Sequence, residues 1–192
     1  MFMLDVLTQL NNMTFWFVKD MANSSLNVLM AYWAYSYALV IPVIVLYMLY
    51  KKDIKFSTFI FAFVALFIIA EVLKMIFREP RPCTDPSLSW INQVGCESGY
   101  SFPSNHATVL GGLFVFLKKY KYIRAGYIVW MLITLFGRVY LGQHYPTDVI
   151  AGFVISVVLC YAIDKNSQKI EKLAARLIAM VPFAKRYFYG TI

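Results

Sequence analysis

The sequence predicts an all-α fold: an integral-membrane helical bundle with about five transmembrane helices and an interfacial helix at each terminus. Composition is the first reason, because 60% of the 192 residues are hydrophobic and only 15% are charged, whereas soluble domains carry about 25% charged residues. Long uncharged stretches are the second reason. Residues 26–50 and 56–70 contain no charge. About 20 apolar residues suffice to cross a bilayer as a helix, so the first stretch is long enough, and the second reaches that length if it continues to Phe77.

The expected spans differ in quality. We place them at roughly 26–50, 56–77, 104–117, 125–141 and 147–163. The last three are shorter or less uniformly apolar than the first two, so hydropathy alone could miss the third. A long polar connection at 79–102 separates the second span from the third. Without a repeat or linker in the sequence, we expect a single domain over 1–192, with the catalytic motifs within 74–148.

Both termini show the pattern of an amphipathic helix lying on a membrane. Near the N-terminus one face is apolar and the other polar: Val6, Leu10, Met13 and Phe17 oppose Asp5, Gln9, Asn12 and Asp20. Near the C-terminus the same division sets Ile170, Leu173, Leu177 and Ile178 against Lys169, Lys172 and Arg176. The alternative is that each helix packs on the bundle as an ordinary core helix.

Lys and Arg are distributed unevenly between the two ends of the expected spans. One end carries 13 of the 18: Lys51, Lys52, Lys55, Lys118, Lys119, Lys121, Arg124, Lys165, Lys169, Lys172, Arg176, Lys185 and Arg186. Because cytoplasmic loops are rich in Lys and Arg, we expect a multi-pass protein of the cell membrane with its C-terminus in the cytoplasm and its N-terminus outside. The net charge of +8 therefore indicates topology, and we expect no nucleic-acid partner.

Polar residues gather at three places on the predicted outer side. They are Lys74 and Arg81 at the end of the second span, Ser104, Asn105 and His106 after Pro103 at the start of the third, and Arg138, His144 and Asp148 around the last turn. Both histidines of the chain belong to this set. Ionisable groups at membrane depth are costly, so a convergent set indicates a functional site.

Each residue type in this set has a chemical use toward a phosphate group. Lys74, Arg81 and Arg138 can hold its oxygens, and the amides of 104–106 lie at a helix N-terminus, which attracts anions. Asp148 lies four residues after His144 and can accept the Nδ1 proton, which leaves Nε2 free to attack phosphorus. His106 can then protonate the leaving oxygen as a general acid.

Simpler explanations exist for single members of the set. Arg78 is best explained as a snorkelling membrane-edge cation, and Glu71 as an ion-pair partner of Lys74 or Arg78. Asp148 also suits the first turn of a helix that Pro146 begins, while Ser104 and Asn105 also suit a helix cap. These explanations do not account for both histidines converging with three cations. Two histidines and scattered carboxylates lack the spacing of metal ligands, so we expect no metal and no cofactor.

These motifs resemble those of the type 2 phosphatidic acid phosphatases. The family signature has a Lys and an Arg-Pro separated by six residues, a Pro-Ser-Gly-His, and a Ser-Arg followed by His and Asp. Lys74 with Arg81–Pro82 fits the first part, and 103–106 fits the second except that Asn105 replaces Gly. Arg138, His144 and Asp148 fit the third, with Gly137 in place of Ser. The match spans 74–148 in order.

The resemblance implies a helical membrane core, no metal, a phosphohistidine at His144 and His106 as the leaving-group acid. It implies that Lys74, Arg81, Ser104 and Arg138 bind phosphate, with Asn105 beside them. Losing the Ser hydroxyl at Gly137 removes one neutral hydrogen bond of about 1 kcal/mol, so we expect activity to survive. Asn105 adds a side chain beside the phosphate, where it can alter specificity.

Within this family the motifs look most like those of the polyprenyl-diphosphate phosphatases. The expected reaction is hydrolysis of undecaprenyl or dolichyl diphosphate to the monophosphate at the outer membrane face, with the substrate and membrane lipids as partners. Three alternatives remain: a phosphatidate or phosphatidylglycerophosphate phosphatase, a lipid phosphotransferase, and a non-enzymatic transporter of anionic lipids. An anion binder has no need of Asp148 behind His144, which favours an enzyme.

Two of the three cysteines share the polar connection. Cys83 and Cys96 can form a disulfide there, because the expected outer side is oxidising. Free thiols at both positions are the alternative, and the sequence does not decide between them.

Overall fold

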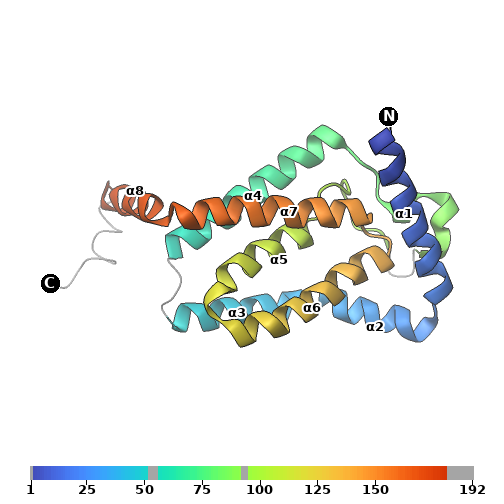
Figure 1. Ribbon diagram of the computed structural model, residues 1–192, viewed down its shortest axis with the longest axis horizontal. Coiled ribbons are helices and arrows are strands. Elements are labelled where there is room, and N and C mark those ends of the chain that lie inside the picture. The colour runs from blue at the N-terminus through green and yellow to red at the C-terminus, as the bar shows by residue number, and fades with distance from the viewer. Residues whose placement is uncertain (1, 52–55, 92–94, 181–192) are drawn as a thin grey trace.

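The computed structural model describes residues 2–51, 56–91 and 95–180, and within these ranges every regular element is helical. The α-helices are α1 (Phe2–Met21), α2 (Ser24–Tyr35), α3 (Tyr37–Tyr50), α4 (Phe56–Phe77), α5 (Asn105–Phe116), α6 (Lys121–Tyr140), α7 (Pro146–Lys165) and α8 (Ser167–Met180). Short 3₁₀ helices lie at η1 (Pro82–Thr84), η2 (Pro86–Ile91) and η3 (Leu117–Lys119). Figure 1 shows α2 to α7 running along the long axis, with α1 crossing one end and α8 at the other.

Four segments of the described chain are long and apolar enough to cross a membrane. They are Ser24–Tyr50, Thr58–Thr84, Lys121–Tyr140 and Pro146–Lys165. Their outward faces expose large apolar side chains such as Leu39, Phe67 and Val158, a surface that is stable in lipid rather than in water. The chain is therefore a multi-pass membrane protein.

The expected span at 104–117 differs from the other four. Its helix, α5, has only 12 residues, which is roughly 18 Å at 1.5 Å per residue and too short to cross the hydrocarbon alone. Most of its side chains are buried, and it lies in the middle of the bundle (Figure 1). Because neighbouring helices surround it, α5 needs no lipid-facing apolar surface, which explains its weak hydropathy signal.

Small residues let α5 approach α7 and α4 closely, as is typical of packed membrane helices. A Cβ added at Gly111 would lie 2.1 Å from Ser156 Oγ, and one at Gly112 would lie 2.9 Å from a methyl carbon of Leu66. A Cβ on Gly152 would lie 2.8 Å from the backbone oxygen of Ser104. This packing fixes the N-terminal end of α5 against the first turns of α7.

The first expected span lies within one candidate membrane crossing, Ser24–Tyr50, which is divided into α2 and α3. α2 and α3 meet at Ser36, whose hydroxyl donates to the Trp33 carbonyl at 2.6 Å and accepts from Trp130 Nε1 at 3.0 Å. Side-chain bonds to the backbone of this kind bend helices. Further along, the Tyr140 hydroxyl donates to Asn27 Oδ1 at 2.5 Å, so α2 is tied to the end of α6.

The terminal helices contact the bundle in different ways. On α1, Phe15 and Val18 are buried, whereas Met13 and Phe17 of the predicted membrane face are exposed and point away from the protein. On α8, Glu171 accepts a hydrogen bond from Thr58 at 3.2 Å. The side chains of Val6, Leu177 and Ile178 lie outside the described residues.

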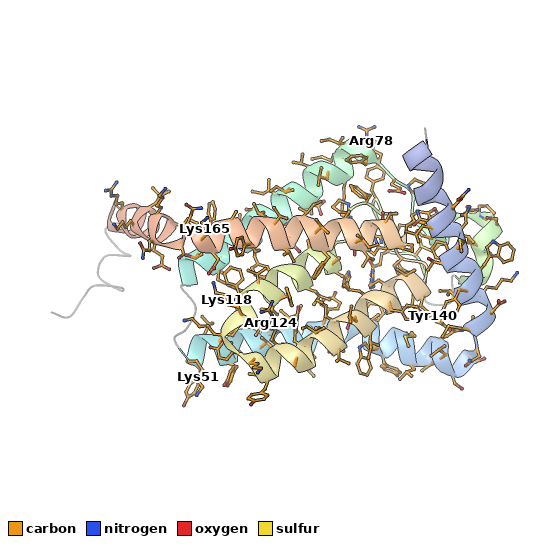
Figure 2. The ribbon with its side chains drawn as sticks, in the orientation of Figure 1. Lys51, Arg78, Lys118, Arg124, Tyr140 and Lys165 are labelled. Carbon is orange, nitrogen blue, oxygen red and sulfur yellow. A yellow bond between two sulfur atoms is a disulfide. The ribbon has the colours of Figure 1, made fainter. Side chains whose placement is uncertain are left out.

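Several of the basic residues that the topology prediction uses gather at one end of the bundle. Lys51, Lys118, Arg124 and Lys165 lie together at one end of the bundle, away from α1 (Figure 2). Lys118 forms an ion pair with Asp164 there. The candidate site residues lie at the opposite end, so the bundle has one strongly basic end and one end that carries the chemistry.

Candidate functional site

Three connections bring the candidate residues to the same end of the bundle. Lys74 lies in the last turn of α4, and Arg81 is the N-cap of η1. His106 lies in the first turn of α5, which Ser104 caps. Arg138 lies in the last turn of α6, and Asp148 in the first turn of α7. His144 lies in the short connection between α6 and α7, so each polar side chain comes from a helix end.

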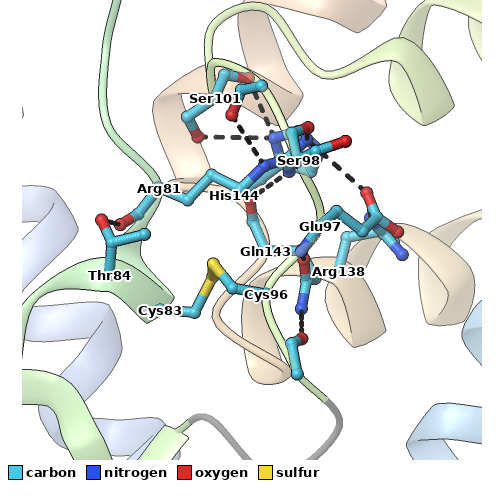
Figure 3. Close-up of a disulfide and its surroundings, with 12 residues drawn as sticks. Arg81, Cys83, Thr84, Cys96, Glu97, Ser98, Ser101, Arg138, Gln143 and His144 are labelled. Carbon is cyan, nitrogen blue, oxygen red and sulfur yellow. Dashed lines mark hydrogen bonds and ion pairs between the residues drawn. A yellow bond between two sulfur atoms is a disulfide. The ribbon is translucent and has the colours of Figure 1, made fainter.

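Arg81 is held in place by the backbone of two loops (Figure 3). It is buried, and it donates to the carbonyl oxygens of Gly99 at 3.2 Å, Ser98 at 3.3 Å and Gln143 at 2.8 Å. Its Nη1 also lies 3.3 Å from His144 Nε2. A guanidinium with this many backbone acceptors is fixed before any ligand arrives.

Arg138 is the opposite case. Its side chain is fully buried, and Nε and Nη1 have no hydrogen-bond partner among the described residues. Its ion-pair partner is Glu97, whose Oε2 lies 2.5 Å from Nη2. Buried donors are normally satisfied, so the unpaired donors of Arg138 indicate an anion-binding position.

His144 is buried with each ring nitrogen in a different environment. Nδ1 lies 3.0 Å from the Ser101 carbonyl oxygen and 3.7 Å from Asp148 Oδ2. Asp148 instead accepts hydrogen bonds from the Ser101 hydroxyl and from the Tyr145 amide. Burial, reinforced by the charges of Arg138 and Arg81 and opposed by Asp148, lowers the pKa of His144 to about 4. The ring is therefore neutral at pH 7, with Nδ1–H donating to Ser101 and the Nε2 lone pair directed toward Arg81.

His106 contacts an aromatic ring rather than a polar partner. Tyr37 packs edge-on against it, with ring centroids 4.4 Å apart, and neither imidazole nitrogen has a hydrogen-bond partner among the described residues. A groove of about 260 Å³, lined by Tyr37, Ile41, Asn105, His106, Val109 and Leu110, opens beside it. The histidine thus lies between the arginine pair and an apolar channel.

The remaining predicted ligands are positioned less directly. The Lys74 ammonium donates to the carbonyl oxygens of Tyr100 and Pro103, each at 2.9 Å, which leaves one of its three protons. The Ser104 hydroxyl accepts from the Ala107 amide as a helix cap. Asn105 donates to Glu71 at 3.1 Å, so Glu71 pairs with Asn105. These residues support the loop beside the arginines. The centre of the candidate site consists of Arg81, Arg138, His106 and His144.

Sequence reasoning missed three residues of this centre: Glu97, Ser101 and Gln143. The Gln143 side chain donates to the Gly95 carbonyl at 2.7 Å and accepts from the Glu97 amide at 3.0 Å. A disulfide between Cys83 and Cys96, with a Cα–Cα distance of 5.8 Å, closes the same loop. One signal was available, since Glu97 is the only acidic residue between Asp85 and Asp148 in the sequence.

The donor set fits an anion better than a metal cation. Ligand atoms of Glu97, His106 and His144 lie within 4.8 Å of one another, which is close enough to hold a metal ion. However, Arg81 and Arg138 contact the same carboxylate, and their charges repel a cation at this position. An anion instead gains from both guanidiniums.

Fold and site together define the class as a membrane-embedded helical bundle with a buried cluster of histidines and arginines at one end. The sequence model of the PAP2 superfamily matches residues 55–171, more than half of the chain. The chain belongs to the PAP2 superfamily.

Individual relatives agree with this assignment. An undecaprenyl-diphosphatase of Sulfolobus acidocaldarius is 30% identical over 118 residues, covering 60% of this chain and 57% of that protein. Phosphatidylglycerophosphatase B of Bacillus subtilis is 32% identical over 119 residues, covering 55% and 54%. The chain thus spans about half the length of the curated relatives it matches.

Two solved structures share the fold. The transmembrane PAP2 type phosphatidylglycerolphosphate phosphatase of Bacillus subtilis superposes with a TM-score of 0.66 at 23% identity, covering 86% of this chain and 88% of that chain. The LpxE structure of Aquifex aeolicus gives a TM-score of 0.60 at 22% identity, covering 79% and 92%. The predicted membrane-helical fold is confirmed.

Proposed function

We propose that the protein is a metal-independent lipid phosphatase that cleaves a terminal phosphate through a phosphohistidine on His144. One observation carries the proposal: Arg138 is fully buried with unpaired donors, and it lies in one cluster with Arg81, His106 and His144. A phosphate group supplies the acceptors that Arg138 lacks. Membership of the PAP2 superfamily supports the same chemistry.

In the first step, the Nε2 lone pair of His144 attacks the terminal phosphorus, and the bond from phosphorus to the leaving oxygen breaks. Arg81 and Arg138 hold the non-bridging oxygens, where preorganised cations stabilise developing charge. Nδ1–H of His144 keeps its bond to the Ser101 carbonyl, which fixes the tautomer. Burial lowers the pKa of His106 to about 3 in the ligand-free site, and the negative charge of a bound phosphate raises it. His106 can then carry the proton that it gives to the leaving oxygen of the shortened lipid.

In the second step, a water molecule attacks the phosphohistidine. His106, now neutral, takes a proton from the water, and the nitrogen–phosphorus bond breaks to restore His144. Inorganic phosphate is then bound between the two arginines and must leave before the next turnover. The protons balance over the two steps, and no metal is used in either.

The groove beside His106 supports a lipid substrate. Its walls from α3 and α5 are apolar, and its polar members, Asn105 and His106, lie at the site. A lipid lying in the bilayer can thus present its phosphate to the histidines while its tail stays between helices. We propose a polyprenyl diphosphate as the substrate, in line with the motif resemblance and with the undecaprenyl-diphosphatases among the relatives.

The distribution of basic residues supports an outward-facing site. Lys51, Lys118, Arg124 and Lys165 lie together at one end of the bundle (Figure 2). The candidate site residues come from the other ends of α5, α6 and α7. By the positive-inside rule the basic end is cytoplasmic. A phosphatase with this orientation acts on lipids at the external face of the cell membrane.

Phosphatidylglycerophosphate is the second candidate substrate, because the relative named phosphatidylglycerophosphatase B is 32% identical. The test is phosphate release by detergent-purified protein, with and without EDTA, from polyprenyl diphosphate, phosphatidate and phosphatidylglycerophosphate. We expect EDTA-resistant release, fastest from polyprenyl diphosphate, and a loss of at least about 1,000-fold in His144→Ala. Thermal melting of the variant checks that it folds.

Each alternative predicts a different result. Faster release from phosphatidylglycerophosphate would leave the mechanism and change the substrate. Transfer of labelled phosphate to an added lipid or sugar, instead of to water, would identify a phosphotransferase. The transporter alternative predicts that the protein releases no phosphate from any of the three lipids. It also predicts that the wild type and His144→Ala bind anionic lipids equally well. These two results together would refute the proposal.

A further inference from the structure

The carboxylate of Glu97 lies at the centre of the candidate site. Its Oε2 is 2.5 Å from Arg138 Nη2 and 3.6 Å from Arg81 Nη2. Its carboxylate also lies within 4.8 Å of a ring nitrogen of both His106 and His144. One oxygen atom therefore contacts both guanidiniums at the position where a phosphate oxygen would bridge them.

The charge of the cluster requires an anion at this position. Arg138 is fully buried, and in the described residues Glu97 is the acidic side chain that pairs with both arginines. A buried guanidinium without a partner is strongly destabilising. Burial tends to raise the pKa of Glu97, but its bond to Arg138 and the charges of Arg138 and Arg81 outweigh this and lower it. The carboxylate is thus ionised at neutral pH.

The loop holds the backbone of Glu97 in place and leaves its side chain partly accessible. Gln143 accepts from the Glu97 amide at 3.0 Å, and Cys96, the preceding residue, is in the disulfide with Cys83. The next two carbonyls, of Ser98 and Gly99, bind Arg81. The side chain itself is 32% exposed. It can therefore rotate toward solvent without any movement of the backbone that orients Arg81.

We propose that Glu97 is the displaceable resting ligand of the phosphate site: its carboxylate leaves the two arginines when the substrate phosphate arrives and returns when inorganic phosphate leaves. The inference rests on the proposed phosphatase function, and it assigns a role to a residue outside the three motifs. A phosphate carries more negative charge than a carboxylate and offers more acceptors, so it wins the exchange while bound. Once the chemistry is complete, the tethered carboxylate competes with the product.

Glu97 competes with every external anion for the two arginines. The apparent affinity for each anion is lowered by the same factor, because only the fraction of protein in which Glu97 has left the site can bind it. In Glu97→Gln, which keeps the side-chain shape and removes the charge, inorganic phosphate should bind at least about tenfold more tightly. The same factor should appear in the KM for the lipid and in product inhibition by phosphate. kcat should stay equal or fall, because release of phosphate becomes slower.

The experiment measures thermal unfolding of the purified full-length protein over a phosphate titration, together with KM, kcat and the Ki of inorganic phosphate. The wild type is compared with Glu97→Gln, Glu97→Asp and Asp85→Asn. Asp85 is an exposed acidic residue of the same loop, so Asp85→Asn controls for the loss of one nearby charge. Glu97→Gln should melt lower than the wild type without phosphate and regain stability with it, which a purely structural ion pair would not do.

Several outcomes would overturn the inference. Phosphate affinity that is unchanged or weaker in Glu97→Gln would do so, as would an equal gain in Asp85→Asn. A fall in kcat with an unchanged Ki for phosphate would instead make Glu97 a positioning residue for His106. If Glu97→Gln does not fold, Glu97→Asp must bind inorganic phosphate more tightly than the wild type, because its shorter side chain reaches the arginines less well, and an unchanged affinity would overturn the inference. The phosphate titration needs no turnover, so it reports on Glu97 even if the lipid assays refute the proposed function.

Discussion

The backbone carbonyl of Ser101 lies 3.0 Å from Nδ1 of His144, closer than the 3.7 Å that separates Nδ1 from Asp148 Oδ2. The Ser101 hydroxyl meanwhile donates to Asp148. Ser101 is therefore inserted between the two residues that sequence reasoning paired directly. The carbonyl fixes the tautomer of the imidazole, and the carboxylate acts on it through Ser101 and through its charge.

This arrangement predicts a moderate effect of Asp148→Asn. Where a carboxylate alone holds the tautomer of a catalytic histidine, its amide costs about 10⁴-fold in kcat. Here the Ser101 carbonyl remains in the variant, so we expect a loss of about 10- to 100-fold. Ser101→Ala keeps that carbonyl and should lose less than about tenfold. Steady-state kcat of the two variants tests this, and a loss near 10⁴-fold in Asp148→Asn would show that the carboxylate acts directly.

The low pKa of His144 predicts an unusual pH profile. An ordinary histidine titrates near 6.5, but burial lowers the pKa of His144 to about 4. The nucleophile is the neutral ring, which stays fully available as the pH falls from 7 to 5. We therefore expect no loss of kcat/KM from His144 in that range and a decline as the pH falls through about 4.

The charge of Asp148 raises the pKa of His144, which provides a control for the pH profile. Removing this charge in Asp148→Asn should move the acidic decline of the residual activity to still lower pH. The profile of kcat/KM from pH 3.5 to 8, corrected for the titration of the substrate, measures this acidic decline in the wild type and in Asp148→Asn. A decline centred near 6.5 that Asp148→Asn leaves in place would contradict the assignment of His144 as a buried neutral nucleophile.

Much of the architecture was predictable because hydropathy and motif order carry the required information. Uncharged runs located α2, α3 and most of α4, and the cation bias separated the two ends of the bundle. The break at Ser36 was not predictable, since it depends on a hydrogen bond from Trp130 on a distant helix. The shortness of α5 was not predictable either, because its burial by α4 and α7 is a tertiary property.

The site was predictable to the extent that chemistry marks single residues. Histidines and arginines are conspicuous in an apolar chain. The structure brings together His106, His144, Arg81 and Arg138. Glu97, Ser101 and Gln143 reach the site only because of the way their loops fold, which the sequence pattern does not reveal. Ser and Gln are also common in loops that have no functional role. Lys74 and Asn105 lie near this group, and their hydrogen bonds run to loop carbonyls and to Glu71. Their expected role as phosphate ligands stays a prediction.

The close approach of α5 to α7 predicts that Gly152→Ala is damaging. Its Cβ would lie 2.8 Å from the Ser104 backbone oxygen and 3.1 Å from Ala107 Cβ, so the start of α5 must shift. Overpacking of this kind costs about 1–3 kcal/mol, and because His106 lies in that turn, kcat should fall too. Gly126→Ala on α6 is the matched control, since nothing lies within 4 Å of its added Cβ. Equal melting temperatures and kcat in the two variants would refute this packing.

The disulfide between Cys83 and Cys96 predicts a definite number of reactive thiols, and it predicts that removing the bond lowers stability. Denatured, unreduced protein should react at one cysteine, Cys160, and reduced protein at three. Three reactive thiols before reduction would show that Cys83 and Cys96 are not paired.

The loop that this bond closes spans 13 residues in sequence separation, for which chain entropy predicts about 3 kcal/mol of stabilisation. Cys83→Ser combined with Cys96→Ser should therefore lower the melting temperature. Because Cys96 adjoins Glu97, the double variant should also loosen the carboxylate at the arginines and change the Ki of inorganic phosphate. Cys160 is buried elsewhere in the bundle, so Cys160→Ala should leave the Ki of inorganic phosphate unchanged. This control separates an effect on the loop from general destabilisation.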